Sequence, residues 1–124
     1  MISGEMMKEI IRNSYLENEN ILIVGYGKSG VKSSELAKRL GATVFVYDDN
    51  KEIEINKEVV DKIYNNIEDI DFSNINITVL SPGVPLESDI AQKSIKSGVE
   101  TIGEIEFGFR YSYRNNTCNN RNKW

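Results

Sequence analysis

The stretch I-L-I-V-G-Y-G-K-S-G, residues 21–30, joins a short apolar run to a turn that contains three glycines. The residues that follow, 31–40, have the character of a helix, and Gly41 ends it. A strand, a G-x-G-x-x-G turn and a helix in this order form a phosphate-binding unit. Free N–H groups and the positive end of the helix dipole face the anion in such a unit. The sequence therefore predicts a phosphate site at residues 25–30.

Each glycine of this turn has its own predicted role. Gly25 permits the tight turn, Gly27 lets the backbone approach an anion, and Gly30 lets the helix pack closely on the strand. Ser29 would add a hydroxyl donor. Lys28 would add a positive charge, although a solvated lysine explains it equally well. The alternative is a glycine turn that only joins strand and helix. The spacing of a Walker A loop is absent.

The rest of the chain alternates predicted strands with predicted helices. Most of the strands are apolar without strict alternation, which is typical of a parallel sheet covered on both faces. We therefore expect an α/β fold, a single Rossmann-like domain with a parallel sheet and helices on both faces. The expected strands are 21–24, 43–47, 75–80 and 99–102, with 59–64 open between a helical turn and a short strand; the expected helices are 2–16, 31–40, 87–97 and 104–111.

Three turns should lie along one edge of this sheet. In open α/β sheets, ligands bind beyond the carboxyl ends of the strands, and the turns after Val24, Tyr47 and Leu80 would share that edge. Asp48 stands 23 residues after Gly25, where a nicotinamide-binding domain places a carboxylate on the ribose. The same carboxylate could accept from the N–H of a uracil ring. It could also be an ordinary turn aspartate.

Ser81, Pro82 and Gly83 end the third of these strands. Pro82 cannot continue the sheet and Gly83 tolerates unusual dihedrals, so the backbone here can approach a ligand. Taken alone, the tripeptide is an ordinary turn. Glu104 and Glu106 form a possible carboxylate pair, but no histidine or metal motif accompanies them. They read as a solvated helix face, and we assign no catalytic residue.

Composition excludes several classes of function. The chain has 124 residues, a net charge of −4 and no histidine, so we expect one domain and no nucleic-acid partner. No apolar run is long enough to span a bilayer, and a signal peptide's basic start is missing. The single cysteine, Cys118, leaves no internal disulfide and no metal cluster. We expect a cytoplasmic monomer without membrane contact.

Four motifs together resemble the N-terminal domain of the Mur ligases, and most closely the branch that adds D-glutamate in peptidoglycan synthesis. They are G-Y-G-K-S-G at 25–30, Y-D at 47–48, S-P-G-V-P at 81–85 and G-E-I-E-F at 103–107. The resemblance implies that residues 1–113 bind the UDP part of UDP-N-acetylmuramoyl-L-alanine. It places Lys28 and Ser29 at the diphosphate, Asp48 near uracil, and Ser81 to Gly83 along the nucleotide.

The family's catalytic parts are not among these residues. In Mur ligases the domain leads into an ATPase domain, opened by a loop resembling A-I-T-G-T-N-G-K-T, and then into a third domain. The resemblance implies that the parent enzyme is an ATP-dependent amide ligase that uses ATP and Mg²⁺. For the 124 residues themselves we expect no cofactor and no catalysis.

Residues 114–124 are polar and without pattern, and they have two explanations. If Arg121 has an AGR codon, back-translating 115–124 and reading from the second base permits I-I-L-A-I-T-G-T-N-G, the start of the missing loop. An A-rich coding end also yields Asn and Lys by composition. The run of successive matches favours a frameshift, so we expect a disordered tail that follows the domain.

The rival function is a stand-alone Rossmann module that senses a nucleotide such as NAD and regulates a partner. A third alternative is a non-functional fragment that only folds. The preferred ligand distinguishes the Mur ligase domain, which would bind a UDP-muramoyl peptide, from the sensing module, which would bind NAD.

Overall fold

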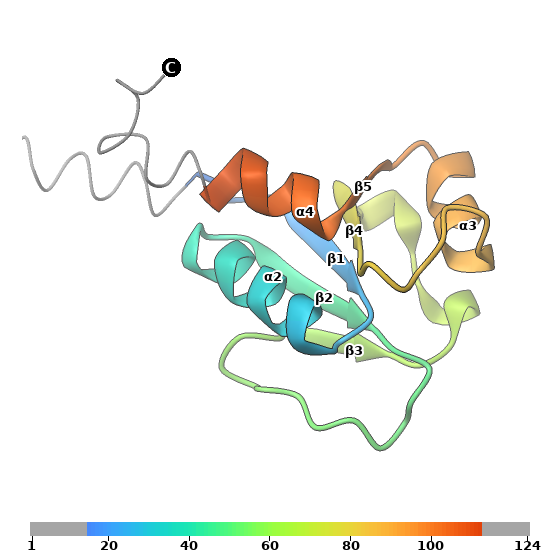
Figure 1. The fold of residues 1–124 in the computed structure, drawn as a ribbon, viewed down its shortest axis with the longest axis horizontal. Helices are drawn as coiled ribbons and strands as arrows, with labels where there is room; N and C mark the ends of the chain where they lie inside the picture. Colours follow the sequence, from blue (N-terminus) through green and yellow to red (C-terminus); the bar gives the residue numbers. More distant parts are fainter. Residues whose placement is uncertain (1–14, 113–124) are drawn as a thin grey trace, which may run out of the picture.

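The computed structural model describes residues 15–112, which form a five-stranded parallel sheet with helices on both faces (Figure 1). The strand order is β3-β2-β1-β4-β5, so the strand of the glycine motif lies at the centre. The predicted fold class is therefore confirmed. The strands are β1 (Asn20–Val24), β2 (Thr43–Tyr47), β3 (Lys62–Tyr64), β4 (Ile77–Leu80) and β5 (Glu100–Gly103). The helices are α2 (Lys28–Arg39), α3 (Asp89–Lys96) and α4 (Glu104–Phe107), with a π-helical turn at Gly108–Ser112 and 3-10 turns at Ile67–Asp69 and Phe72–Asn74.

Strand β1 is apolar at every position from Ile21 to Val24 because both of its faces are buried. Ile21 and Ile23 belong to the hydrophobic cluster on one face of the sheet. Leu22 and Val24 belong to the cluster on the other face. Side chains alternate between the faces of a strand, so a continuous apolar run is what a doubly covered strand requires.

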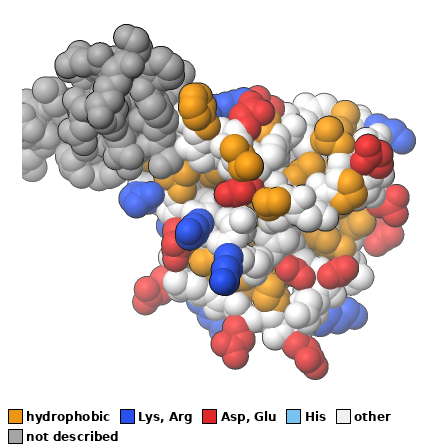
Figure 2. All heavy atoms as spheres, in the orientation of Figure 1, with side chains coloured by type: hydrophobic (Ala, Val, Ile, Leu, Met, Phe, Trp, Pro, Cys, Tyr) orange, Lys and Arg blue, Asp and Glu red, His pale blue; other side chains and the backbone are white. Residues whose placement is uncertain are grey.

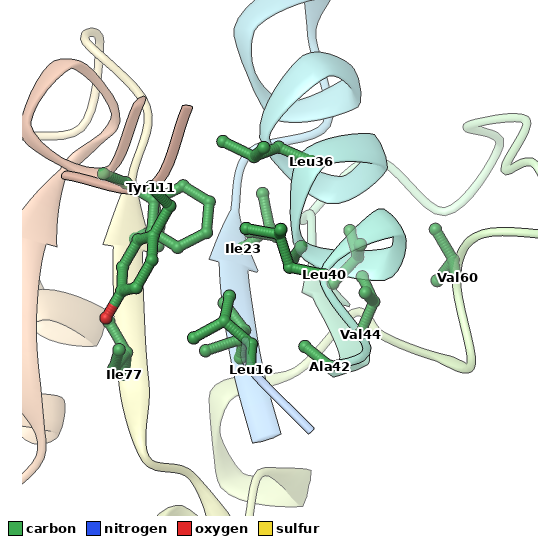
Figure 3. Close-up of a cluster of buried hydrophobic side chains, with 14 of the residues drawn as sticks. Leu16, Ile23, Leu36, Leu40, Ala42, Val44, Val60, Ile77 and Tyr111 are labelled. Carbon is green, nitrogen blue, oxygen red and sulfur yellow. The ribbon is translucent and has the colours of Figure 1, made fainter. Parts of the chain in front are cut away.

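The first cluster lies under α2 and the last helical segment. Figure 3 shows Leu36 and Leu40 of α2 beside Ile23 of β1. Tyr111 lies across β1 from α2 and belongs to the same cluster. Phe107 of α4 is completely buried in the same cluster. The segment after β5 therefore packs back onto the sheet next to α2, and it forms part of the folded domain.

The second cluster covers the opposite face. It contains Ile90 and Ala91 of α3, together with Ile70 and Phe72 from the region of the two 3-10 turns. The start of α3 is thereby fixed next to the carboxyl end of β1. This placement gives the candidate site one of its walls.

Several boundaries differ from the sequence predictions. Segment 59–64 contains the short strand β3, at the sheet edge beside β2. The strand predicted from Ile75 begins at Ile77, because Ile75 ends the 3-10 turn before it. The helix predicted at 104–111 changes to a π-helical turn after Phe107.

The two terminal predictions lie largely outside the described residues. Of the predicted helix 2–16, residues 2–14 are not described, and Tyr15 and Leu16 belong to a turn. The predicted tail, 114–124, is also outside the described part. Among residues 15–112, no helix is long and apolar enough to cross a membrane.

Charged side chains of both signs are interspersed on the face seen in Figure 2, which carries α2 and α4. Proteins that bind nucleic acid usually gather Lys and Arg on one continuous surface. On the face in view, Lys and Arg side chains are mixed with Asp and Glu and form no continuous basic area.

Candidate functional site

The three predicted turns meet at the carboxyl edge of the sheet, as expected. Gly25 follows β1, Asp48 follows β2 and Ser81 follows β4. The backbone N–H of Gly25 donates to the Tyr47 carbonyl at 2.8 Å, and that of Ser81 donates to the Val24 carbonyl at 3.1 Å. The parallel pairing of β1 with both neighbours thus brings residues far apart in the sequence into one site.

The N-terminus of α2 is open towards this edge. Gly27 is its N-cap, no side chain caps it, and its first turn contains no acidic residue. The start of α3 differs, since the Ser88 hydroxyl accepts from the Ala91 N–H at 3.4 Å and Asp89 lies in the first turn. The start of α3 is therefore capped by its own side chain, whereas the first N–H groups of α2 have no side-chain partner among residues 15–112.

Two of the three glycines are required by the fold itself. Gly25 has a φ of +92°, a left-handed conformation that other residues rarely adopt. A Cβ on Gly30 would lie 1.9 Å from the Gly25 carbonyl oxygen. Both match the roles predicted from the sequence.

Gly27 is different, because the folded chain has room for a side chain there. Its φ is −86°, within the range of any residue. A Cβ at this position would meet no atom of the protein within 4 Å. The space beside the Gly27 backbone, at the open helix end, is therefore empty without being needed for packing. A ligand that approaches the backbone would use this space.

The Lys28 ammonium and the Ser29 hydroxyl of the loop also have no partner among residues 15–112. Lys28 is exposed, and no carboxylate of residues 15–112 pairs with it. Ser29 is half-buried in the first turn of α2, and its hydroxyl has no partner among those residues. Both groups lie where the sequence predicted contacts with phosphate.

A hollow of about 330 Å³ lies beside this loop, between the ends of β1 and β2 and the start of α3. We call it the Asp48 hollow. Its walls combine apolar side chains with three carboxylates. It is lined by Val24, Gly25, Tyr47, Asp48, Asp49, Ile67, Gly83, Val84, Pro85, Ser88, Asp89 and Ile90.

The charge of the Asp48 hollow limits the kind of ligand that it can bind. Asp48, Asp49 and Asp89 would repel a phosphate group but would accept hydrogen bonds from a neutral ring that carries N–H groups. Burial and the nearby charges of Asp49, Asp48 and Glu68 raise the pKa of Tyr47, so its phenol keeps its proton. The hollow is therefore suited to a base and unsuited to an anion.

Asp48 and Ser81 both bond to the glycine loop. The Asp48 carboxylate accepts from the Tyr26 N–H through Oδ2 and from the Asn50 N–H through Oδ1, each at 2.9 Å. The Ser81 hydroxyl donates to the Gly25 carbonyl at 3.0 Å. Asp48 is thus also the turn aspartate that the sequence offered as an alternative, with lone pairs left for a ligand.

A second hollow, of about 370 Å³, lies on the other side of Val84, between the ends of β4 and β5 and the start of α4. Glu104 and Glu106 are on its rim. Glu106 forms an ion pair with Arg110 at 2.5 Å, and Arg110 also pairs with Glu100 at 2.9 Å. The pairing of Glu106 agrees with the prediction of a solvated helix face. In the part of the chain that the structure describes, no group of acidic, His or Cys residues is arranged to hold a metal ion.

Sequence reasoning missed two parts of the site. The wall formed by Ile67 and by the start of α3 comes from segments whose position depends on the tertiary fold. Tyr26, the residue between the first two glycines, is buried, and its hydroxyl accepts from the Asn56 N–H at 3.3 Å. The only sequence signal for the buried position of Tyr26 is that an aromatic residue stands between two glycines of the turn.

Comparison with curated proteins finds relatives at about 35% identity. A protein of Caldicellulosiruptor saccharolyticus is 35% identical over 104 residues, which cover 77% of this chain and 23% of the relative. A protein of a Thermoanaerobacter species is 33% identical over 105 residues, covering 78% and 23%. Both are named UDP-N-acetylmuramoylalanine--D-glutamate ligase. The chain spans about a quarter of the length of these relatives.

Among solved structures, shikimate dehydrogenase from Aquifex aeolicus has a similar fold, with a TM-score of 0.50 and 15% identity. The match covers 90% of this chain and 52% of that enzyme, and at this identity it shows the Rossmann-like fold alone. Residues 19–103, from the residue before β1 to the end of β5, match the family model described as Mur ligase MurD-like, N-terminal domain. The chain therefore belongs to the family of MurD-like Mur ligase N-terminal domains.

Proposed function

We propose that this chain binds the UDP part of UDP-N-acetylmuramoyl-L-alanine, as the N-terminal domain of the ligase that adds D-glutamate in peptidoglycan synthesis. The family match and the names of the relatives support this substrate. The observation that carries the proposal is the open N-terminus of α2, next to a hollow that suits a base.

The diphosphate would bind at the first turn of α2. The N–H groups of Lys28, Ser29 and Gly30 would donate to its oxygens, with the Ser29 hydroxyl and the Lys28 ammonium adding to them. Gly27 leaves the space that such an approach requires. Gly25 and Gly30 give the loop its shape.

The uracil would bind in the Asp48 hollow, where Asp48 or Asp49 would accept a hydrogen bond from its ring N–H. Segment 81–83 would line the nucleotide, with Gly83 as part of the wall. This orientation follows from charge, because the acidic hollow favours the base and the helix end favours the anion.

The amide-bond chemistry would belong to the rest of the parent ligase. ATP would activate the terminal carboxylate of the substrate as an acyl phosphate, which the amine of D-glutamate would attack. Positioned ATP and Mg²⁺ are needed for such a transfer. Residues 15–112 show no arrangement of side chains suited to a metal ion, and no Walker A loop is present in the sequence. We infer that this chain contributes substrate binding and forms no ADP by itself.

Calorimetric titration with UDP and with NAD in parallel tests the binding. The proposal predicts that UDP binds more tightly than NAD. A preference for NAD would support the nucleotide-sensing module instead.

A matched pair of glycine variants locates the site. Gly27→Val should abolish UDP binding, because the side chain fills the space of the diphosphate. Gly108→Val is the control, since a Cβ at Gly108 also meets no atom within 4 Å, but Gly108 is the C-cap of α4 and faces the later turns of α2 instead of its N-terminus. Thermal melts of both variants verify folding. Equal UDP affinity in the two variants would refute the proposed location.

A further inference from the structure

The peptide group between Gly25 and Tyr26 is held by two side chains that are distant in the sequence. Its carbonyl oxygen accepts from the Ser81 hydroxyl at 3.0 Å, and its N–H donates to Oδ2 of Asp48 at 2.9 Å. Ser81 follows β4 and Asp48 follows β2, the two strands that flank β1. Each neighbour of the central strand thus supplies one of the two bonds.

Helix α2 restrains the same peptide group from a third direction. A Cβ on Gly30 would lie only 1.9 Å from the Gly25 carbonyl oxygen, so the oxygen lies directly against the helix. The adjoining residue, Tyr26, is buried in the core, with an exposed fraction of 7%. The peptide group cannot rotate without breaking both hydrogen bonds or displacing α2.

We propose that Ser81 and Asp48 are positioning residues for the diphosphate site. They fix the peptide group that leads into α2, and they thereby aim the N–H groups of its first turn at the anion. The inference rests on the function proposed above and deepens it. A loop that is already ordered loses less entropy when the ligand binds, so the two side chains increase affinity through Gly25 and Tyr26.

The first test uses the chain without ligand. Ser81→Ala removes one bond to the peptide group, and the amide NMR signals of Tyr26 to Gly30 should shift or broaden. Asp48→Ala removes the other bond and should have the same effect. Ser34→Ala is the matched control, because the buried Ser34 also donates its hydroxyl to a backbone carbonyl, that of Val31 at 2.7 Å, away from this peptide group.

The second test compares UDP with uridine by calorimetry. Ser81→Ala should weaken UDP binding about tenfold and change uridine binding less than twofold, because the N–H groups that it misaligns, those of Lys28 to Gly30, would contact the diphosphate and not the base. Ser81→Thr, which keeps the hydroxyl, should restore most of the UDP affinity. Ser34→Ala should leave both affinities unchanged.

Two results would overturn the proposal. Unchanged loop signals in ligand-free Ser81→Ala would show that Ser81 does not order the loop, even if UDP affinity fell through a lost direct contact. Equal losses of UDP and uridine affinity would show a general loosening of the site. If the unmodified chain bound no UDP, the proposed function would fail, and the ligand-free spectra would still decide whether the two side chains order the loop.

Discussion

Replacing Gly27 by aspartate should make the domain more stable and a poorer ligand binder at once. The N-cap of α2 has extended dihedrals, open space for a Cβ and no capping side chain. An aspartate at an N-cap accepts from the free N–H groups of the first turn, which is worth a few tenths of a kcal/mol over glycine. Its charge at the helix N-terminus adds about 0.3–1 kcal/mol.

The expected gain in unfolding free energy is therefore about 1 kcal/mol, which corresponds to a Tm increase of about 4–8 °C for a domain of this size. The carboxylate would take the N–H groups that the diphosphate needs, and it would also repel it. Two unit charges 4 Å apart interact by about 4 kcal/mol at an effective dielectric constant of 20. Even after screening by salt, UDP affinity should fall at least about tenfold.

Thermal melts and UDP calorimetry on the same samples measure both effects. Gly27→Asn is the control, because it caps the helix without the charge and should lose less affinity. Higher stability with unchanged UDP affinity would refute the reasoning, since it would show that the helix end is open but not used. Lower stability would show that the helix end is not an unused N-cap.

Three further predictions concern the framework of the site. Gly30→Ala should destabilise the domain by about 3 kcal/mol or more in chemical denaturation, because the added Cβ would overlap the Gly25 carbonyl oxygen. Phe107→Ala should cost about 3–5 kcal/mol by the same measurement, since the completely buried ring joins α4 to the core; a smaller loss would mean that α4 is not part of the cooperative unit. Burial tends to raise the pKa of Asp61, but hydrogen bonds from Lys38 and a backbone N–H outweigh it and lower this pKa below its usual value. Its contribution to stability is therefore complete above the unfolded pKa, near 4, and is lost as the pH falls through the lower folded value. Asp61→Asn should reduce stability at pH 7 and make it less dependent on pH below 4, and an unchanged acid limb in pH-dependent melts would contradict this.

The central part of the fold could be predicted from sequence because its signals are local. The apolar run of β1, the glycine turn and the amphipathic α2 are adjacent in the chain, and each has a distinct pattern. Strand β3 could not be assigned, because three residues, one of them charged, at a sheet edge give almost no periodicity. The π-helical turn after Phe107 has no known local signature in this sequence.

The sequence predicts where the candidate site lies, but it predicts only some of the contacts within the site. The rule for parallel sheets placed Gly25, Asp48 and Ser81 on one edge. The bonds of Asp48 and Ser81 to a single peptide group depend on the register of β1 with both neighbours, which the sequence does not reveal. The wall that Ile67 gives the Asp48 hollow likewise depends on tertiary packing.

The most direct test of the account is to follow the amide signals of the chain during a titration with UDP. We expect the largest shifts at Lys28, Ser29 and Gly30 in the first turn of α2, and at Asp48 and Asp49 beside the Asp48 hollow. Shifts confined to the second hollow between β5 and α4, or a response to NAD with none to UDP, would contradict it.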